Sequence, residues 1–238
     1  MHPRLGATLA ACITLLLAAC AQVKPAPELA EKGALPPDFP EAYYRQAAAQ
    51  GKPVFRVDSK NSLVVIEVRR SGSLARLGHD HVVASHDVKG YAVPADGRAD
   101  LYVALAQLVV DEAALRAEAG FQTQPSESDI AGTRSNMLNS VLEAERFPFA
   151  LIRVTGVDAH KGSGPINVAI TLHGTTRTPV VPAQIDASGY QLTVSGRFSF
   201  DQTEFGITPY SLLGGAIAVA NQVDLRFRTL ATRVGSQD

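Results

Sequence analysis

The most informative absence in this chain is cysteine. Its 238 residues include only Cys12 and Cys20, and both lie within the first twenty positions. The rest of the chain therefore forms no disulfide, offers no thiolate nucleophile and builds no cysteine-based zinc site. A domain without such cross-links depends on its hydrophobic core for stability.

A dominant charge of one sign is also missing. The chain has 22 Lys and Arg residues against 23 Asp and Glu residues, and it contains no block of basic residues. Nucleic-acid binding needs clustered positive charge to neutralise phosphates. The composition therefore argues against nucleic acid as a partner.

Common catalytic and nucleotide-binding motifs are absent as well. There is no G-x-S-x-G elbow for a serine nucleophile, and Ser163 lies in the loop-like stretch "GSGP". The glycines of "SLLGGAIA" (211–218) match neither G-x-G-x-x-G nor G-K-[ST]. We therefore expect a protein that is not an enzyme and that uses no cofactor.

Only one long hydrophobic run is present, near the start of the chain. Residues 5–17 carry no charge, but thirteen residues at about 1.5 Å each cannot cross a hydrocarbon core of about 30 Å. The run therefore predicts a signal peptide and not a membrane-spanning helix. It ends in Leu17-Ala18-Ala19-Cys20, which resembles the lipobox of bacterial lipoproteins. An ordinary secretory signal, cleaved nearby, is the alternative.

The lipobox resemblance implies a membrane anchor. Residues 1–19 would be removed as a lipoprotein signal peptide, and Cys20 would carry acyl chains such as palmitate. Each buried methylene contributes about 0.8 kcal/mol, so several chains together give stable anchoring. Lipoproteins of the inner membrane often carry Asp where this chain has Ala21. The expected location is therefore the outer membrane, facing the periplasm.

The remainder of the chain divides into a spacer and one domain. Residues 20–52 contain five prolines and are expected to form an extended tether after the lipidated terminus, with a possible short helix over 41–50. Residues 53–232 have the length of a single domain, and 233–238 are expected to be a tail.

Two-residue periodicity predicts a domain made mainly of β-strands. Large apolar residues alternate with smaller or polar ones over 166–173, 190–200 and 222–228. Helical spacing predicts a helix over 126–145, and a shorter helix is possible over 111–120. About eight antiparallel strands with one apolar face form either a sandwich or a closed barrel, and periodicity leaves both open. Further strands are expected at 54–58, 62–70, 86–93, 99–110, 149–157 and 179–187.

Five segments, in family order, resemble the YceI family of bacterial periplasmic proteins. The resemblance implies a lipocalin-like antiparallel β-barrel of about eight strands with one or two capping helices. It also implies an apolar interior that binds a long isoprenoid or a related amphiphile. Residues 74–86 and 111–128 depart from the family's usual pattern. The segments are "FRVDSKNSLVVIEVRR" (55–70), "NMLNSVLEAERFPFALIRVTGV" (136–157), "LHGTTRTPVVP" (172–182), "FSFDQTEFGI" (198–207) and "NQVDLRFRTLA" (221–231).

The apolar faces of the three clearest strands provide candidates for the wall of such an interior. A filled barrel has the same alternation, so plain core packing is the alternative for each residue. The candidates for ligand binding are Val168, Ile170, Val194, Phe198, Phe200, Leu225 and Phe227.

Polar chemistry is densest in "GHDHVVASHD", residues 78–87. His79 and His81 share one face of a strand, and together with His86 they are weak candidates for a metal site. Two clear ligands fall short of the usual three or four, so no metal is expected. In a second interpretation, His79, His81 and His173 line the barrel mouth and bind a polar headgroup. In a third, the stretch serves only turn and strand-end hydrogen bonds.

These features predict a periplasm-facing lipoprotein that stores, carries or senses an isoprenoid lipid or a quinone-like molecule. Two alternatives belong to other classes. One is a metal-binding protein based on His79, His81 and His86. The other is a stress-related interaction protein with a solid, ligand-free barrel.

Overall fold

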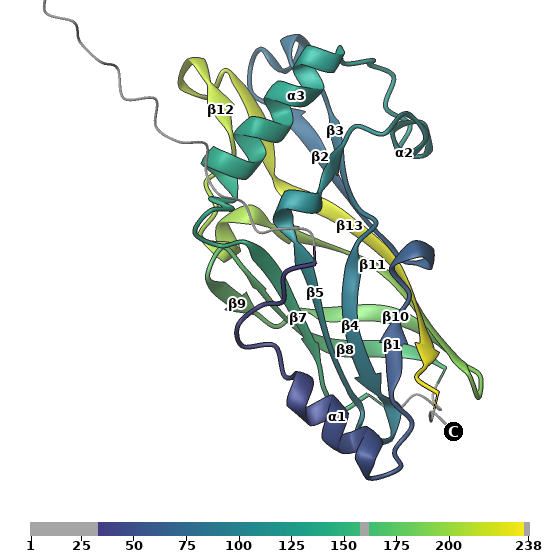
Figure 1. Ribbon diagram of the computed structural model, residues 1–238. Helices are drawn as coiled ribbons and strands as arrows, with labels where there is room; N and C mark the ends of the chain where they lie inside the picture. The colour runs from purple at the N-terminus through teal and green to yellow at the C-terminus, as the bar shows by residue number, and fades with distance from the viewer. Residues whose placement is uncertain (1–32, 158–161, 236–238) are drawn as a thin grey trace, which may run out of the picture.

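A computed structural model describes residues 33–157 and 162–235, in which strands predominate (Figure 1). The helices are α1 (Glu41–Ala49), α2 (Ala113–Glu118) and α3 (Glu127–Asn136), which continues into a π-helical turn (Met137–Val141). The strands are β1 (Phe55–Val57), β2 (Leu63–Ser71), β3 (His81–Ser85), β4 (Val88–Val93), β5 (Arg98–Ala104), β6 (Val109–Val110), β7 (Phe149–Val154), β8 (Ser163–Leu172), β9 (Thr175–Arg177), β10 (Val180–Ala187), β11 (Gln191–Asp201), β12 (Ser211–Leu212) and β13 (Ile217–Arg233).

Two sequence-based expectations lie outside these residues. Residues 1–19 and Cys20 are not among those described, so the signal peptide and the lipid attachment stay predictions. Within the described ranges, no helix combines the length and the apolar character needed to span a bilayer.

Eight strands close into an antiparallel barrel. They follow one another around the ring in the order β1–β4–β5–β7–β8–β10–β11–β13. The last strand then pairs with the first, from Phe55 opposite Arg233 to Val57 opposite Ala231. This closing pair confirms the expected barrel over the sandwich.

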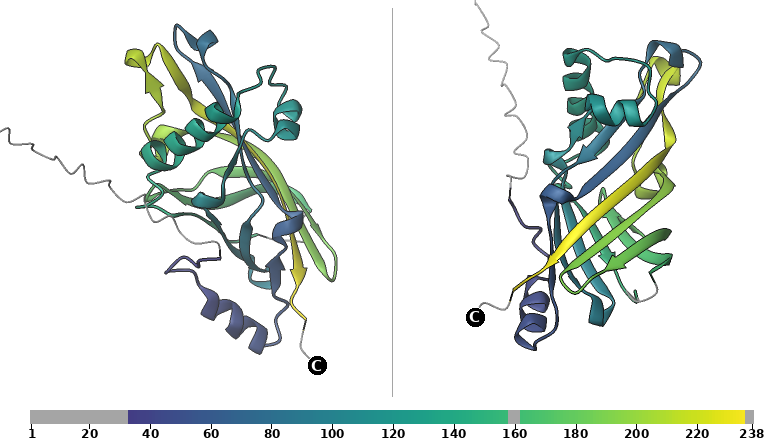
Figure 2. Two further views of the ribbon diagram at one scale, coloured as in Figure 1. Left: turned by 45° about the horizontal axis from the view of Figure 1, so that its top comes forward. Right: turned by 90° about the vertical axis from the view of Figure 1, so that its right-hand side faces the viewer.

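The longest strand, β13, connects the barrel to a sheet extension. One edge of β13 pairs with β11 from Gln222 to Thr232. Its other edge pairs first with β2 and then with β1. Beyond β2, β3 and β6 extend the sheet at one end of the molecule, and Figure 2 shows β13 running the whole length of the barrel.

Strand β3 was not predicted, because its sequence does not alternate. Val83 packs in the main core. On the opposite face, Val82 and Ala84 pack against Leu115 and Phe121 of residues 112–123, which contain α2 and are here called the α2 segment. The sequence of a strand that is buried on both faces is a nearly continuous run of apolar residues, without alternation. The expected strand over 86–93 therefore begins only at Val88, after a turn that follows β3.

Two further boundaries differ from the expectations. The predicted strand over 99–110 is interrupted by a 3₁₀ turn over Leu105–Gln107, so it is present as β5 and β6. The predicted helix over 126–145 begins as expected, because Ser126 and Asp129 form a capping box. It then widens into the π turn and ends at Val141.

The segment before the barrel is folded against it, which corrects the interpretation of residues up to 52 as a tether. Tyr44 and Ala47 of α1 are buried together with Val54 and Val93. The ring of Tyr44 lies 5.2 Å from that of Tyr91 on β4. In the described part, a spacer therefore does not extend to residue 52, because aromatic side chains dock α1 on the outer face of the barrel.

A buried carboxylate fixes this helix. Asp100 on β5 accepts hydrogen bonds from Tyr44 Oη (2.7 Å), Arg98 Nε (2.7 Å) and Arg153 Nε (2.5 Å). Burial alone favours the neutral carboxyl, but the bonds from Arg153, Arg98 and Tyr44 outweigh it and hold the pKa of Asp100 below its usual value. An ionised acceptor strengthens each bond, so Asp100 connects α1, β5 and β7.

We predict that Tyr44→Ala lowers the free energy of unfolding by about 3 kcal/mol, because it leaves a cavity between α1 and β4 and removes a bond to a buried carboxylate. Urea denaturation of the full chain measures the change. Tyr190→Ala is the matched control, since Tyr190 is 77% exposed whereas Tyr44 is 3% exposed. Equal stability of the two variants would mean that α1 is not docked.

Candidate functional site

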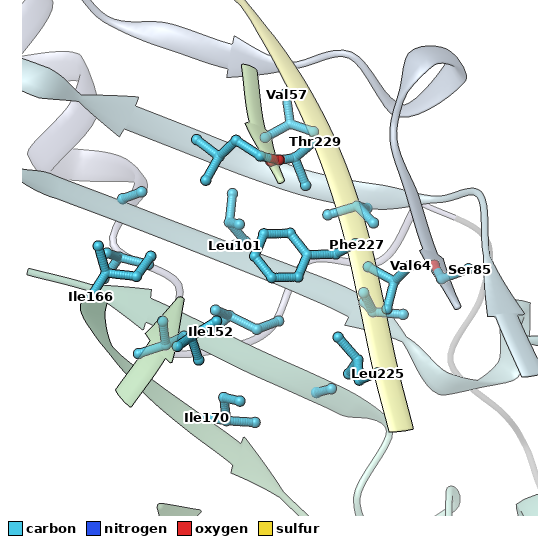
Figure 3. Close-up of a pocket in the computed structure, with 18 of the residues that line it drawn as sticks. Val57, Val64, Ser85, Leu101, Ile152, Ile166, Ile170, Leu225, Phe227 and Thr229 are labelled. Atoms are coloured by element: carbon cyan, nitrogen blue, oxygen red, sulfur yellow. The ribbon is translucent and has the colours of Figure 1, made fainter. Parts of the chain in front are cut away.

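A long cavity occupies the interior of the barrel (Figure 3). Its volume is about 260 Å³, and its wall includes residues from all eight barrel strands and from β2 and β3. Along β5 and the turn that follows, the wall runs from Arg98 to Leu105, which corresponds to roughly 23 Å at about 3.3 Å per residue. The cavity is thus elongated along the strands.

The strand alternation builds this wall. Every second residue of β8 faces inward, and cross-strand neighbours such as Ile152 and Ile170 meet on the same surface. Figure 3 shows Leu101, Ile152 and Ile170 on one side of the space, with Leu225 and Phe227 of β13 across from them. The geometry can enclose a long apolar molecule.

The structure places all seven candidate residues on the cavity wall. They come from β8, β11 and β13, which alternate clearly in the sequence. Whether they bind a ligand stays a prediction. The seven are Val168, Ile170, Val194, Phe198, Phe200, Leu225 and Phe227.

The sequence analysis did not identify the part of the wall that β5 and β7 supply. The inward faces of β5 and β7 supply Ala99, Leu101, Val103, Ala150 and Ile152. Both strands were expected, and their alternation contained the signal, but the inward face was not assigned. Two of these wall residues are alanines, whose small side chains leave space inside the barrel.

A glycine on β11 leaves room for an aromatic ring from the neighbouring strand. Gly196 lies opposite Phe227 in the β11–β13 pair. A Cβ atom at position 196 would lie 2.9 Å from the Phe227 ring and 2.5 Å from the backbone oxygen of Pro182. The ring occupies the place of the missing side chain, so Gly196 sets the shape of the cavity.

The polar side chains on the described part of the wall are already hydrogen-bonded. Thr229 Oγ1 donates to the Val194 carbonyl (3.3 Å), and Ser85 Oγ accepts from the Asp87 amide (3.3 Å). Arg98 bonds to Asp100, and its guanidinium lies 4.1 Å from the centre of the Tyr43 ring. A polar group carried deep into the cavity would find few partners, which favours apolar ligands.

The three histidines expected at the mouth do not line the cavity. His81 Nδ1 donates to Asp111 Oδ2 (2.7 Å) at the start of β3 and is not part of the cavity wall. His79 packs beside it, with the two ring centres 6.2 Å apart. His173 bonds to Glu143 Oε1 (3.1 Å) and stacks on Phe147. This corrects the expected histidine rim.

The alternative metal site, for which His79, His81 and His86 were weak candidates, is contradicted by their positions. His81 and His86 flank the two ends of β3, roughly 16 Å apart along an extended chain, whereas zinc ligands lie about 2 Å from one ion. His86 Nε2 instead contacts Glu112 Oε2 (2.8 Å). Over 33–157 and 162–235, no three His, Cys, Asp or Glu side chains are arranged to hold a metal.

The histidine-rich segment belongs to a buried ion network. Asp111 is enclosed by His81, by the Val82 amide (3.0 Å) and by Arg116 Nη1 (2.5 Å). Arg116, 1% exposed, also donates to the backbone carbonyls of Asp80 and Thr123. The network holds the α2 segment on β3, so its role is structural.

The comparisons with known proteins agree with this geometry. A family model described as YceI-like domain matches residues 55–231. A solved polyisoprenoid binding domain from Saccharophagus degradans, implicated in plant cell wall breakdown, is 11% identical, with a TM-score of 0.56 over 76% of this chain and 98% of that chain. Burkholderia cenocepacia BcnA is 17% identical, with a TM-score of 0.53 over 74% of this chain and 99% of that chain. At these identities the similarity concerns the fold alone. A comparison with curated proteins gave no match.

We predict that the Asp111 network loses its stabilising effect in acid. Burial favours the neutral carboxyl, but bonds from His81, the Val82 amide and Arg116 hold the pKa of Asp111 below its usual value. The stabilisation is therefore complete above the unfolded pKa of about 3.9 and is lost as the pH falls through the lower folded pKa. Asp111→Asn should cost about 3 kcal/mol at pH 7 and progressively less below pH 4 or so.

Urea denaturation across this pH range measures the difference from the wild-type chain. Asp186→Asn on the exposed face of β10 is the control and should change stability by less than about 0.5 kcal/mol. A cost for Asp111→Asn that does not change with pH would contradict the assignment.

Proposed function

This chain belongs to the YceI-like family, and from that premise we propose that it binds a long isoprenoid lipid, or a similar amphiphile, inside its barrel. One observation carries the proposal: the cavity is elongated, and its wall is apolar along almost its whole length. The described neighbour from Saccharophagus degradans, a polyisoprenoid binding domain of the same fold, supports this class of ligand.

The driving force is burial of the apolar tail. Removing several hundred Å² of hydrocarbon from water, at about 25 cal/mol per Å², contributes on the order of 10 kcal/mol before ordering costs. This mechanism needs no reacting group, so the protein stores, carries or senses its ligand without transforming it. A quinone with an isoprenoid tail belongs to the same ligand class, because the tail provides most of the buried surface.

The place of action follows from the start of the sequence. The lipobox-like Leu17-Ala18-Ala19-Cys20 and the residue Ala21 support a lipoprotein anchored in the outer membrane and facing the periplasm. An anchored carrier remains beside the bilayer from which an isoprenoid lipid can be taken. The anchor would thus keep the cavity close to the membrane that supplies its ligand.

We predict that filling the cavity removes the ligand. Ala99→Phe and Ala150→Phe each project a ring from the wall into the space that the tail would occupy. Each should lower the lipid-bound fraction about tenfold, equal to about 1.4 kcal/mol. Native mass spectrometry of the full chain, purified in mild detergent, followed by lipid extraction, measures this fraction.

Ala169→Phe is the matched control. Ala169 lies on β8 between two wall residues, Val168 and Ile170, and is not part of the cavity wall itself. This variant should retain the ligand. A wild-type chain that carries no lipid under these conditions would instead support a ligand-free barrel. Equal lipid content in all three variants would mean that the lipid binds elsewhere.

A further inference from the structure

Two loops that are far apart in the sequence form one exposed apolar tip. The first loop, 72–78, forms most of the connection 72–80 between β2 and β3, and the second, 211–216, contains β12 and leads into β13. The Leu74 amide donates to the Ala216 carbonyl (2.7 Å), and a Cβ atom on Gly72 would lie 2.5 Å from the backbone oxygens of Gly215 and Ala216. The two loops therefore form one structural unit, here called the leucine tip.

The leucine tip presents three exposed leucines. Leu77, Leu212 and Leu213 are 61%, 48% and 74% exposed, respectively. Leu213 also has a φ of 51°, a conformation that is uncommon for residues other than glycine and costs of the order of one kilocalorie per mole or more. Exposed apolar side chains on a strained backbone are a recurring property of contact sites.

Several backbone amides of the leucine tip are bonded within the protein. The amides of Ala75, Leu77 and Gly78 donate within their own loop, and that of Ala216 donates to Leu213. Residues 211 and 212 pair with the start of β13. A segment that enters a membrane must satisfy its polar backbone groups internally, because hydrocarbon offers no partners.

The charge of the leucine tip favours an anionic surface. Residues 72–78 and 211–216 contain no acidic residue, and the exposed Arg76 lies directly before Leu77. Asp80, at the end of the same connection, accepts from the Arg70 amide and forms an ion pair with the Arg70 side chain. Arg76 has no ion-pair partner among the described residues. A Lys or Arg beside an anionic leaflet is attracted to it, so Arg76 adds an electrostatic attraction to the burial of the leucines.

The small size of the leucine tip favours a bilayer over a protein partner. A stable protein interface buries about 800 Å² on each side, and three leucines on two short loops fall well below that area. A bilayer surrounds a protruding segment and can bury each exposed side chain. Figure 1 shows both loops at the end of the molecule where α3 lies. Leu142, directly after the π turn that continues α3, is part of the cavity wall.

We infer that the leucine tip is a membrane-contact site that inserts into an anionic bilayer. The contact directs the α3 end of the barrel toward the membrane. The inference deepens the proposed function, on which it rests, by identifying the end of the barrel that faces the lipid source.

Single tryptophans test the inference, because the chain contains no tryptophan of its own. Leu77→Trp and Leu212→Trp place a fluorophore on the leucine tip. Each full chain is reconstituted with vesicles of phosphatidylglycerol and phosphatidylethanolamine that carry bromine on the acyl chains. The emission should shift to shorter wavelength and be quenched by roughly half, since an inserted segment lies at the boundary between headgroups and acyl chains.

Tyr190→Trp is the matched control. Tyr190 is more exposed than Leu77 or Leu212, so exposure alone would favour its quenching. It lies near the other end of β13, where its carbonyl accepts from the Arg233 amide, about 50 Å from the leucine tip at about 3.3 Å per residue. A lipid anchor would hold every variant on the vesicle surface. A difference in quenching between the tip tryptophans and the tryptophan at position 190 therefore reports contact of the tip with the acyl chains. Arg76→Gln should reduce the quenching in phosphatidylglycerol vesicles to the level seen in phosphatidylcholine vesicles.

Equal quenching at the leucine tip and at position 190, or none at the tip, would overturn the inference. A blue shift that depends on protein concentration and is insensitive to bromine would also overturn it, because a second copy would then cover the leucines. Native mass spectrometry of the same samples separates the two proposals. Bound lipid with an unquenched tip contradicts only membrane contact, whereas a quenched tip without bound lipid contradicts only lipid carriage.

Discussion

The pairing of β1 with β13 is the constraint on which the rest of the structure depends. It closes the sheet, so the alternating residues of eight strands face one shared interior, and it removes edges that would otherwise pair with other chains. Because β13 also pairs with β2, the same strand supports the sheet extension that ends in the leucine tip. The cavity and the proposed membrane contact thus share one strand.

The sequence predicted the parts of this fold in which one face of a strand is apolar and the other is wet. The inward residues of β8, β11 and β13 could be named in advance because their periodicity is clear. Strand β3 could not, because the α2 segment covers its outer face and removes the alternation. The docking of α1 was also missed, since it depends on Asp100, Arg98 and Arg153, whose meeting is decided by the register of β5 and β7.

The histidine-rich segment shows why the density of polar residues is a poor guide to the site in this protein. Its chemistry is used in a network in which His81 and Arg116 compensate a buried carboxylate. Leaving Asp111 without these partners would cost several kcal/mol, so the residue types are explained by folding. The candidate site lies in the barrel interior, in apolar residues that strand alternation and the family resemblance indicated.

The shortage of unpaired polar groups on the cavity wall has a consequence for selectivity. A site discriminates strongly between ligands when its buried donors and acceptors bond to one ligand. A molecule that lacks the matching groups leaves them unpaired and binds much more weakly. Ser85, Thr229 and Arg98 already have partners within the protein, so the deep cavity has little basis for rejecting one functional group in favour of another. Fit to the cavity remains as the criterion, and the Phe227 ring beside Gly196 takes up part of that space. A barrel of this kind sorts molecules by fit, and it would hold a range of chain lengths rather than a single compound.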